Sequence, residues 1–114
     1  MKTHTLNLNP LYFDLIKQGI KTLEGRLNDE KRQTFSIGDK IIFFKEPERI
    51  ESMEAIILDK YLFTNFVDMA NTLNKEALGF AKQSKEEMIA TYRKFYKNED
   101  ERKYGVVIFK IKKL

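Results

Sequence analysis

The 114-residue sequence contains no cysteine and no tryptophan, and it has only one histidine. Without cysteine, disulfide bonds, thiolate metal sites and a cysteine nucleophile are excluded. A single histidine would leave carboxylates to supply nearly every ligand of a zinc ion, so we expect no metal site. We also expect the protein to need no cofactor.

Long apolar runs are missing too. No stretch approaches the roughly 20 apolar residues that span a bilayer, so we expect no membrane association. The N-terminal residues 1–4 run directly into an alternating pattern and lack the apolar segment of a signal peptide. Together these observations predict a cytoplasmic protein.

Charge of one sign is not concentrated anywhere in the chain. Residues 1–49 carry nine basic and seven acidic side chains, and residues 50–114 carry twelve and ten. The net charge of +4 therefore permits nucleic-acid binding without requiring it, because affinity for phosphates depends on basic groups that cluster in space. A hydrophobic fraction of 42% at this length indicates one folded domain that spans residues 1–114.

Periodicity predicts an α+β chain with the order β-α-β-β-β-α-α-β. The middle strands follow one another without helical crossovers, which favours a mostly antiparallel, partly closed sheet. The expected strands cover residues 3–8, 21–27, 40–45, 53–62 and 104–111, and the expected helices begin at Pro10, after Thr64 and at Ser84. Residues 98–102 are expected to form a polar break.

Apolar residues at helical spacing predict which faces of two helices are buried. In the first helix, which Gly19 should end, they are Leu11, Leu15 and Ile16. In the last helix they are Met88, Tyr92 and Phe95. That helix begins with Ser84 and Glu87 at the spacing of a capping box, S-x-x-E.

The segment Gly19-Ile20-Lys21-Thr22-Leu23-Glu24-Gly25-Arg26 resembles the signature G-x-K-x-x-E-x-R of the ASCH family. Three further segments add to the resemblance: the charged loop 28–32, the turn 37–39 and the closing strand from Tyr104. The resemblance implies a PUA-like, mostly antiparallel β-barrel flanked by about three short helices. It also implies a cleft beside the signature and a role in RNA metabolism.

The chemistry of the signature depends on where its side chains point. In an extended segment, Thr22, Glu24 and Arg26 share one face, and Lys21 sits at the corner where the helix gives way to the strand. A Lys-Glu-Arg trio facing a cavity would bind phosphate or carbonyl oxygens. The alternative is a solvated strand edge held by weak ion pairs. Arg32 fits phosphate positioning if its loop borders the cleft.

Two functions remain open. The one we favour is a module that binds RNA, a nucleoside or a nucleotide in a charged cleft through Lys21, Thr22, Glu24, Arg26 and Arg32. The alternative follows from a distant resemblance to small bacterial N4-acetylcytidine amidohydrolases, which implies catalytic roles for Lys21, Glu24 and Glu87. Those enzymes have a threonine nucleophile at the position of Glu24. In this chain either Glu24 or Glu87 would activate water, or Thr22 would attack the acetyl carbonyl directly. The alternative role of Glu87 is structural: its side chain completes the capping box of its helix.

Overall fold

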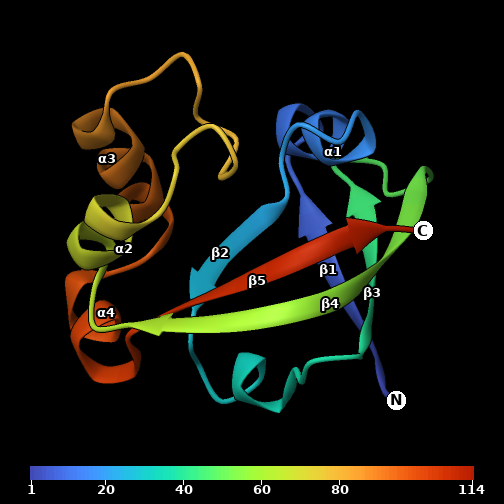
Figure 1. Cartoon of the computed structure of the whole chain (residues 1–114), viewed down its shortest axis with the longest axis horizontal. Coiled ribbons are helices and arrows are strands. Elements are labelled where there is room, and N and C mark those ends of the chain that lie inside the picture. The colour runs from blue at the N-terminus through green and yellow to red at the C-terminus, as the bar shows by residue number, and fades with distance from the viewer.

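Five strands form one strongly curled sheet in the order β1-β3-β4-β5-β2 (Figure 1). The computed structural model of the chain describes residues 1–114. Its elements are β1 (Thr3–Leu8), α1 (Pro10–Lys17), β2 (Leu23–Leu27), the 3-10 turn η1 (Arg32–Thr34), β3 (Lys40–Lys45), β4 (Ser52–Phe63), α2 (Phe66–Thr72), α3 (Lys85–Phe95), α4 (Asn98–Tyr104) and β5 (Val106–Lys113). The α+β class is therefore as predicted.

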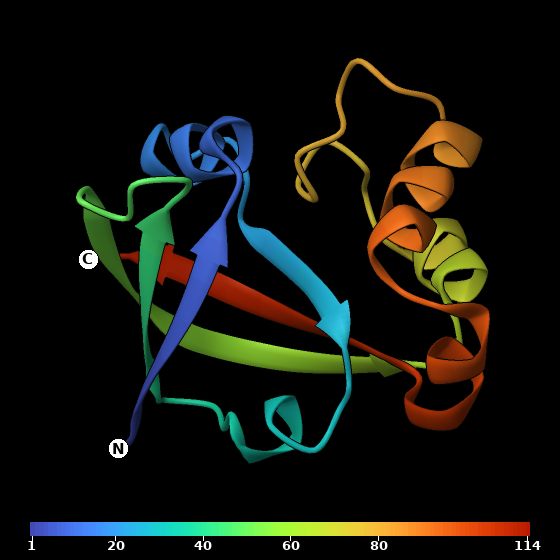
Figure 2. The same ribbon diagram turned by 180° about the vertical axis from the view of Figure 1, so that it is seen from behind.

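The sheet is mixed, because β1 pairs with β3 in parallel while the other three pairings are antiparallel. Parallel neighbours need a long connection, and here α1, β2 and η1 lie between them in the sequence. The expected barrel is also left open. The strands β1 and β2 are the two edges of the curled sheet, and Figure 2 shows both with α3 beyond β2.

Two hydrophobic clusters pack against opposite faces of the sheet, and β5 contributes to both. Its residues 107, 109 and 111 join the cluster under α1, whereas residues 106 and 108 join the cluster that includes α2 and α3. A strand buried on both faces has to be apolar at every position. This requirement explains the uninterrupted run Val106–Phe109, all of it buried.

The expected polar break at residues 98–102 is wrong, because these residues lie in α4. Three acidic residues occupy the first turn of α4 and two basic residues occupy the last, which suits the helix dipole. Glu101 is 3% exposed and accepts hydrogen bonds from Arg93 Nε (3.0 Å) and from the backbone N–H of Phe66 (3.0 Å). This buried carboxylate ties α4 to α2 and α3, and it gives the chain four α-helices instead of about three.

The buried faces of two helices agree in part with those predicted, since Ile16, Met88 and Tyr92 are buried as expected. Helix α1 buries Phe13 and Ile16, while Leu11 is 55% exposed. Helix α3 buries Met88 and Tyr92, while Phe95 is 69% exposed. In α1, residues 13 and 16 are three apart and so share a face, which is the one that meets the sheet. None of the helices is both long and apolar enough to cross a membrane.

Three of the helices begin at residues whose side chains cap the first turn. Asn9 caps α1 and Ser84 forms the predicted capping box with Glu87, whose side chain accepts from the Ser84 backbone N–H at 2.8 Å. Helix α2 is capped by Asn65 and not by Thr64, because the Asn65 side chain accepts from the N–H of Asp68 at 2.8 Å. Asparagine is the stronger N-cap of the two neighbours.

Gly105 provides a test of how α4 is joined to β5. Its φ of 72° and ψ of −166° lie in a region that is open essentially to glycine alone, and an added Cβ would stand 2.9 Å from the carbonyl oxygen of Phe63. We predict that Gly105→Ala lowers the free energy of unfolding by about 1–3 kcal/mol in urea denaturation. Gly38→Ala is the control, since Gly38 has φ of 92° but open space around it. Equal losses for the two variants would contradict this account.

Candidate ligand-binding site

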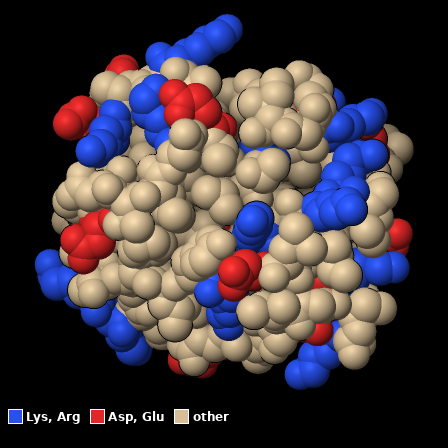
Figure 3. Space-filling view, in the orientation of Figure 1, with Lys and Arg blue, Asp and Glu red and all other residues tan.

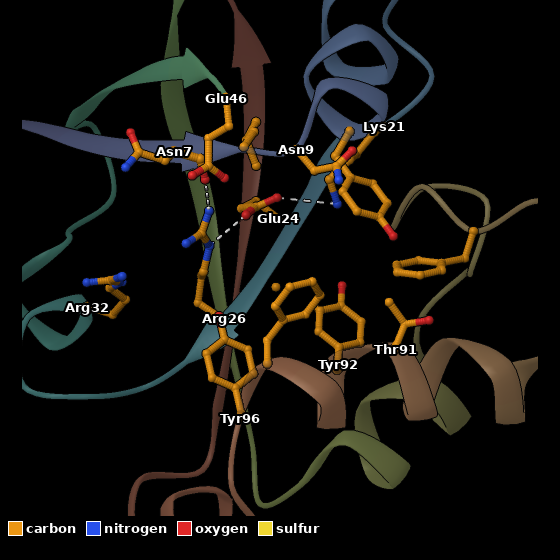
Figure 4. A pocket seen from close by; sticks show the side chains of 15 residues that line it. Asn7, Asn9, Lys21, Glu24, Arg26, Arg32, Glu46, Thr91, Tyr92 and Tyr96 are labelled. Carbon is orange, nitrogen blue, oxygen red and sulfur yellow. Dashed lines mark hydrogen bonds and ion pairs between the residues drawn. The ribbon is translucent and has the colours of Figure 1, made fainter. Parts of the chain in front are cut away.

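A pocket of about 360 Å³ lies where the ends of β1 and β2 face α3 (Figure 4). Its volume is within the range of small-molecule sites, about 300–1,000 Å³. The residues that line it are Asn7, Leu8, Asn9, Tyr12, Lys21, Glu24, Gly25, Arg26, Arg32, Glu46, Phe80, Thr91, Tyr92, Phe95 and Tyr96. The face of the molecule drawn in Figure 3 has acidic and basic side chains interspersed without a broad basic patch.

The structure brings Lys21, Glu24 and Arg26 together at this pocket. Arg26 Nε donates to Glu24 Oε2 at 2.7 Å, and Lys21 Nζ lies 3.4 Å from Glu24 Oε1. Lys21 and Glu24 are only 3% and 4% exposed. These ion pairs are therefore screened little by solvent, in contrast to the weak pairs of a solvated strand edge.

The ammonium group of Lys21 is fully occupied by the protein. It donates to the backbone carbonyls of Leu23 (2.7 Å) and Leu78 (2.6 Å) in addition to its contact with Glu24. Lysine has three donors, so none is left for a ligand. Burial lowers the pKa of Lys21, and the nearby Glu24 carboxylate opposes that shift. Its visible role is to hold the loop that contains Leu78 against the start of β2.

Glu24 is held in its ionised form. Burial alone would raise its pKa, but the charges of Lys21 and Arg26 and their hydrogen bonds outweigh burial, and the net effect lowers the pKa. A carboxylate with a lowered pKa is a weak proton acceptor at neutral pH. Glu24 therefore suits hydrogen-bond acceptance and charge balance better than general base catalysis.

Arg26 bridges the two edges of the open sheet. Its Nη2 donates to the backbone carbonyl of Asn7 in β1 at 2.9 Å, while its Nε is engaged by Glu24. Nη1 forms no hydrogen bond within the protein. The guanidinium group is thus fixed in orientation and still keeps free donors at the pocket.

Aromatic side chains form the other wall of the pocket. The ring of Phe80 lies 5.4 Å from those of Tyr12 and Tyr92, measured between centroids. Phe95 and Tyr96 continue this wall. Burial raises the pKa of Tyr92 well above its ordinary value, so its hydroxyl stays protonated. Flat apolar faces with a few polar atoms are the composition expected for binding a planar ring.

Gly25 in β2 leaves the space that the aromatic wall needs next to the strand. A Cβ on Gly25 would stand 2.9 Å from the hydroxyl oxygen of Tyr92 and 3.0 Å from Cδ1 of Ile108. The glycine between Glu24 and Arg26 therefore allows Tyr92 to approach β2 closely. No local sequence pattern indicates this contact, because Tyr92 is 67 positions further along the chain.

The remaining predicted site residues lie in different places. Arg32 lines the pocket, as the loop hypothesis required. Thr22 is exposed and is not among the lining residues, and Glu87 is engaged in the capping box and lies outside the pocket as well. Thr22 precedes β2, so the strand alternation that placed it beside Glu24 does not extend to it. No group of three or more metal-ligating side chains is present.

Sequence reasoning missed part of the site. It assigned Tyr92 and Phe95 to the core by helical spacing, and it did not single out Tyr12 or Phe80 for the site. The amphipathic pattern of α3 contains a usable signal, since three aromatic residues within five positions exceed what one buried stripe needs. No comparable signal marks Phe80, which reaches the pocket from the loop between α2 and α3.

Replacing Glu24 with glutamine tests the buried ion pairs. The variant keeps the shape of the side chain but leaves two buried cations without their counter-charge, and we predict a loss of about 3–5 kcal/mol in the free energy of unfolding. Glu51→Gln is the matched control, because Glu51 pairs with Lys17 at 2.7 Å with both side chains about half exposed. Urea denaturation should show a much smaller change for the control, and equal changes would contradict the prediction.

Comparisons with known proteins agree with the observed fold. The profile of the ASCH domain family matches residues 6–114. The crystal structure of the hypothetical protein PH0355 is similar, with a TM-score of 0.87, 36% identity and complete coverage of both chains. The solution NMR structure of PF0455 from Pyrococcus furiosus has a TM-score of 0.72 and 33% identity, covering 100% of this chain and 98% of that one.

A more distant likeness concerns the fold alone. The crystal structure of a tyrosine-to-phenylalanine mutant of ZmASCH from Zymomonas mobilis has a TM-score of 0.69 at 16% identity, covering 98% of this chain and 70% of that one. No curated protein sequence matches the chain significantly. Since the family profile extends over nearly the entire sequence, the chain belongs to the ASCH domain family.

Proposed function

We propose that the protein binds RNA by taking one nucleoside unit into the pocket between β2 and α3. The observation that carries this proposal is an aromatic wall facing a charged trio whose orientation is fixed by buried ion pairs. Single-stranded RNA is recognised in this way, by stacking of an unpaired base and hydrogen bonds to its edge. The association of ASCH domains with RNA supports the same class of ligand.

The two walls of the pocket have separate roles in this proposal. Phe95 and Tyr96 provide faces on which a base stacks, while the Glu24 carboxylate and the Tyr92 hydroxyl offer hydrogen-bond partners to its edge. The role proposed for Lys21 differs from the direct contact with phosphate that the sequence led us to expect. Because its three donors are occupied, it contributes by keeping Glu24 ionised and by holding the loop next to the pocket.

Phe95 provides the clearest test of stacking, because it is 69% exposed and its removal should disturb the core little. We predict that Phe95→Ala weakens binding of a short labelled single-stranded RNA by about 1–3 kcal/mol in a fluorescence anisotropy titration at fixed salt. Leu62→Ala is the control, since Leu62 is 63% exposed on β4 and is not part of the pocket. If both variants keep the parental affinity, stacking on α3 is not how the protein binds RNA.

The hydrolase alternative receives less support from the placement of its residues. Thr22 and Glu87 lie outside the pocket, and the lowered pKa of Glu24 makes it a weak base. We predict that the purified protein incubated with N4-acetylcytidine releases no cytidine above the buffer blank in a chromatographic assay. Cytidine release that depends on protein concentration and disappears in Glu24→Gln would replace the binding proposal with a catalytic one.

A further inference from the structure

Two arginine side chains lie at one end of the pocket. Figure 4 shows Arg26 and Arg32 on the side of Asn7 and Glu46, with Lys21 at the opposite end. They come from different elements, Arg26 from β2 and Arg32 from the turn η1. The fold therefore brings two cationic side chains together at the same end of the pocket.

Neither guanidinium group is saturated by the protein. Arg26 uses Nε and one hydrogen of Nη2, which leaves Nη1 without a partner. The side chain of Arg32 makes one long contact, 4.0 Å from Nη1 to Asp29 Oδ1, although it is only 19% exposed. A partly buried guanidinium group with unused donors loses hydration without full compensation. This arrangement favours an incoming anion.

Basic side chains outnumber acidic ones along the pocket. The pocket is lined by three basic residues and by two acidic ones, Glu24 and Glu46. Glu24 contacts both Lys21 (3.4 Å) and Arg26 (2.7 Å) and so offsets part of the charge of each, and the lining residues together retain one excess positive charge. Burial raises the pKa of the Tyr96 hydroxyl; Arg26 and Arg32 oppose that shift, Glu24 and Asp29 add to it, and the net pKa is raised.

We propose that the pocket is specific for phosphorylated nucleosides, with the phosphate held between Arg26 and Arg32 and the base on the aromatic wall. The ligand class is thus a nucleotide unit, free or within an RNA chain, and not a free nucleoside. Planar guanidinium groups bind phosphate oxygens through paired N–H donors, which fixes the phosphate relative to the base. This inference rests on the proposed function and narrows it.

The test compares each of adenosine, cytidine, guanosine and uridine with its 5′- and 3′-monophosphate by isothermal titration calorimetry. We expect at least one monophosphate to bind about tenfold or more tightly than its nucleoside, the effect of about 1.4 kcal/mol. Arg32→Gln should abolish most of that difference. Lys31→Gln is the matched control, because Lys31 is the adjacent basic residue of the same loop, is exposed and does not line the pocket.

The outcomes separate this inference from the function on which it rests. Equal affinity for nucleosides and their monophosphates would overturn phosphate recognition and leave nucleoside binding intact. Competition by inorganic phosphate alone at the same concentration as the nucleotides would overturn the nucleotide site, and absence of binding by every nucleoside and nucleotide would count against both. Circular dichroism of Arg32→Gln and Lys31→Gln excludes loss of folding as the reason for a weaker signal.

Discussion

The carboxylate of Glu24, buried between Lys21 and Arg26, is the contact on which the rest of the site depends. Two cations at 3.4 Å and 2.7 Å compensate its desolvation, and each cation reaches further into the structure. Lys21 extends to the loop at Leu78, and Arg26 extends to Asn7 in β1. One buried charge thereby joins a strand, a loop and the far edge of the sheet.

In this arrangement the lysine of the signature, Lys21, has a structural role. A lysine beside a cleft suggests a group that contacts substrate, yet here two backbone carbonyls and Glu24 engage all its donors. The docked loop carries Phe80, whose ring packs against Tyr12 and Tyr92. The ion pairs therefore shape the aromatic wall of the pocket as well as the charged one.

The pocket lies at the open edge of the sheet, where β1 and β2 are not paired. The Arg26 side chain spans the gap between these two strands by donating to the backbone carbonyl of Asn7. Helix α3 covers the opening from the other side. The pocket at the incompletely closed barrel thus combines charged and aromatic side chains within one cavity of about 360 Å³.

The sequence by itself determined what short-range chemistry controls: the α+β class, most strand and helix positions, the capping box at Ser84 and the face shared by Glu24 and Arg26. It also placed the signature residues at a corner between helix and strand. Helix α4 escaped prediction because its polar residues are stabilised by the burial of Glu101 against Arg93, a contact between elements. Only the tertiary structure decided that Lys21 is occupied, that Glu87 lies outside the pocket and that Phe80 lines it. Those outcomes depend on contacts such as Lys21 with Leu78, 57 positions apart, which no local pattern encodes.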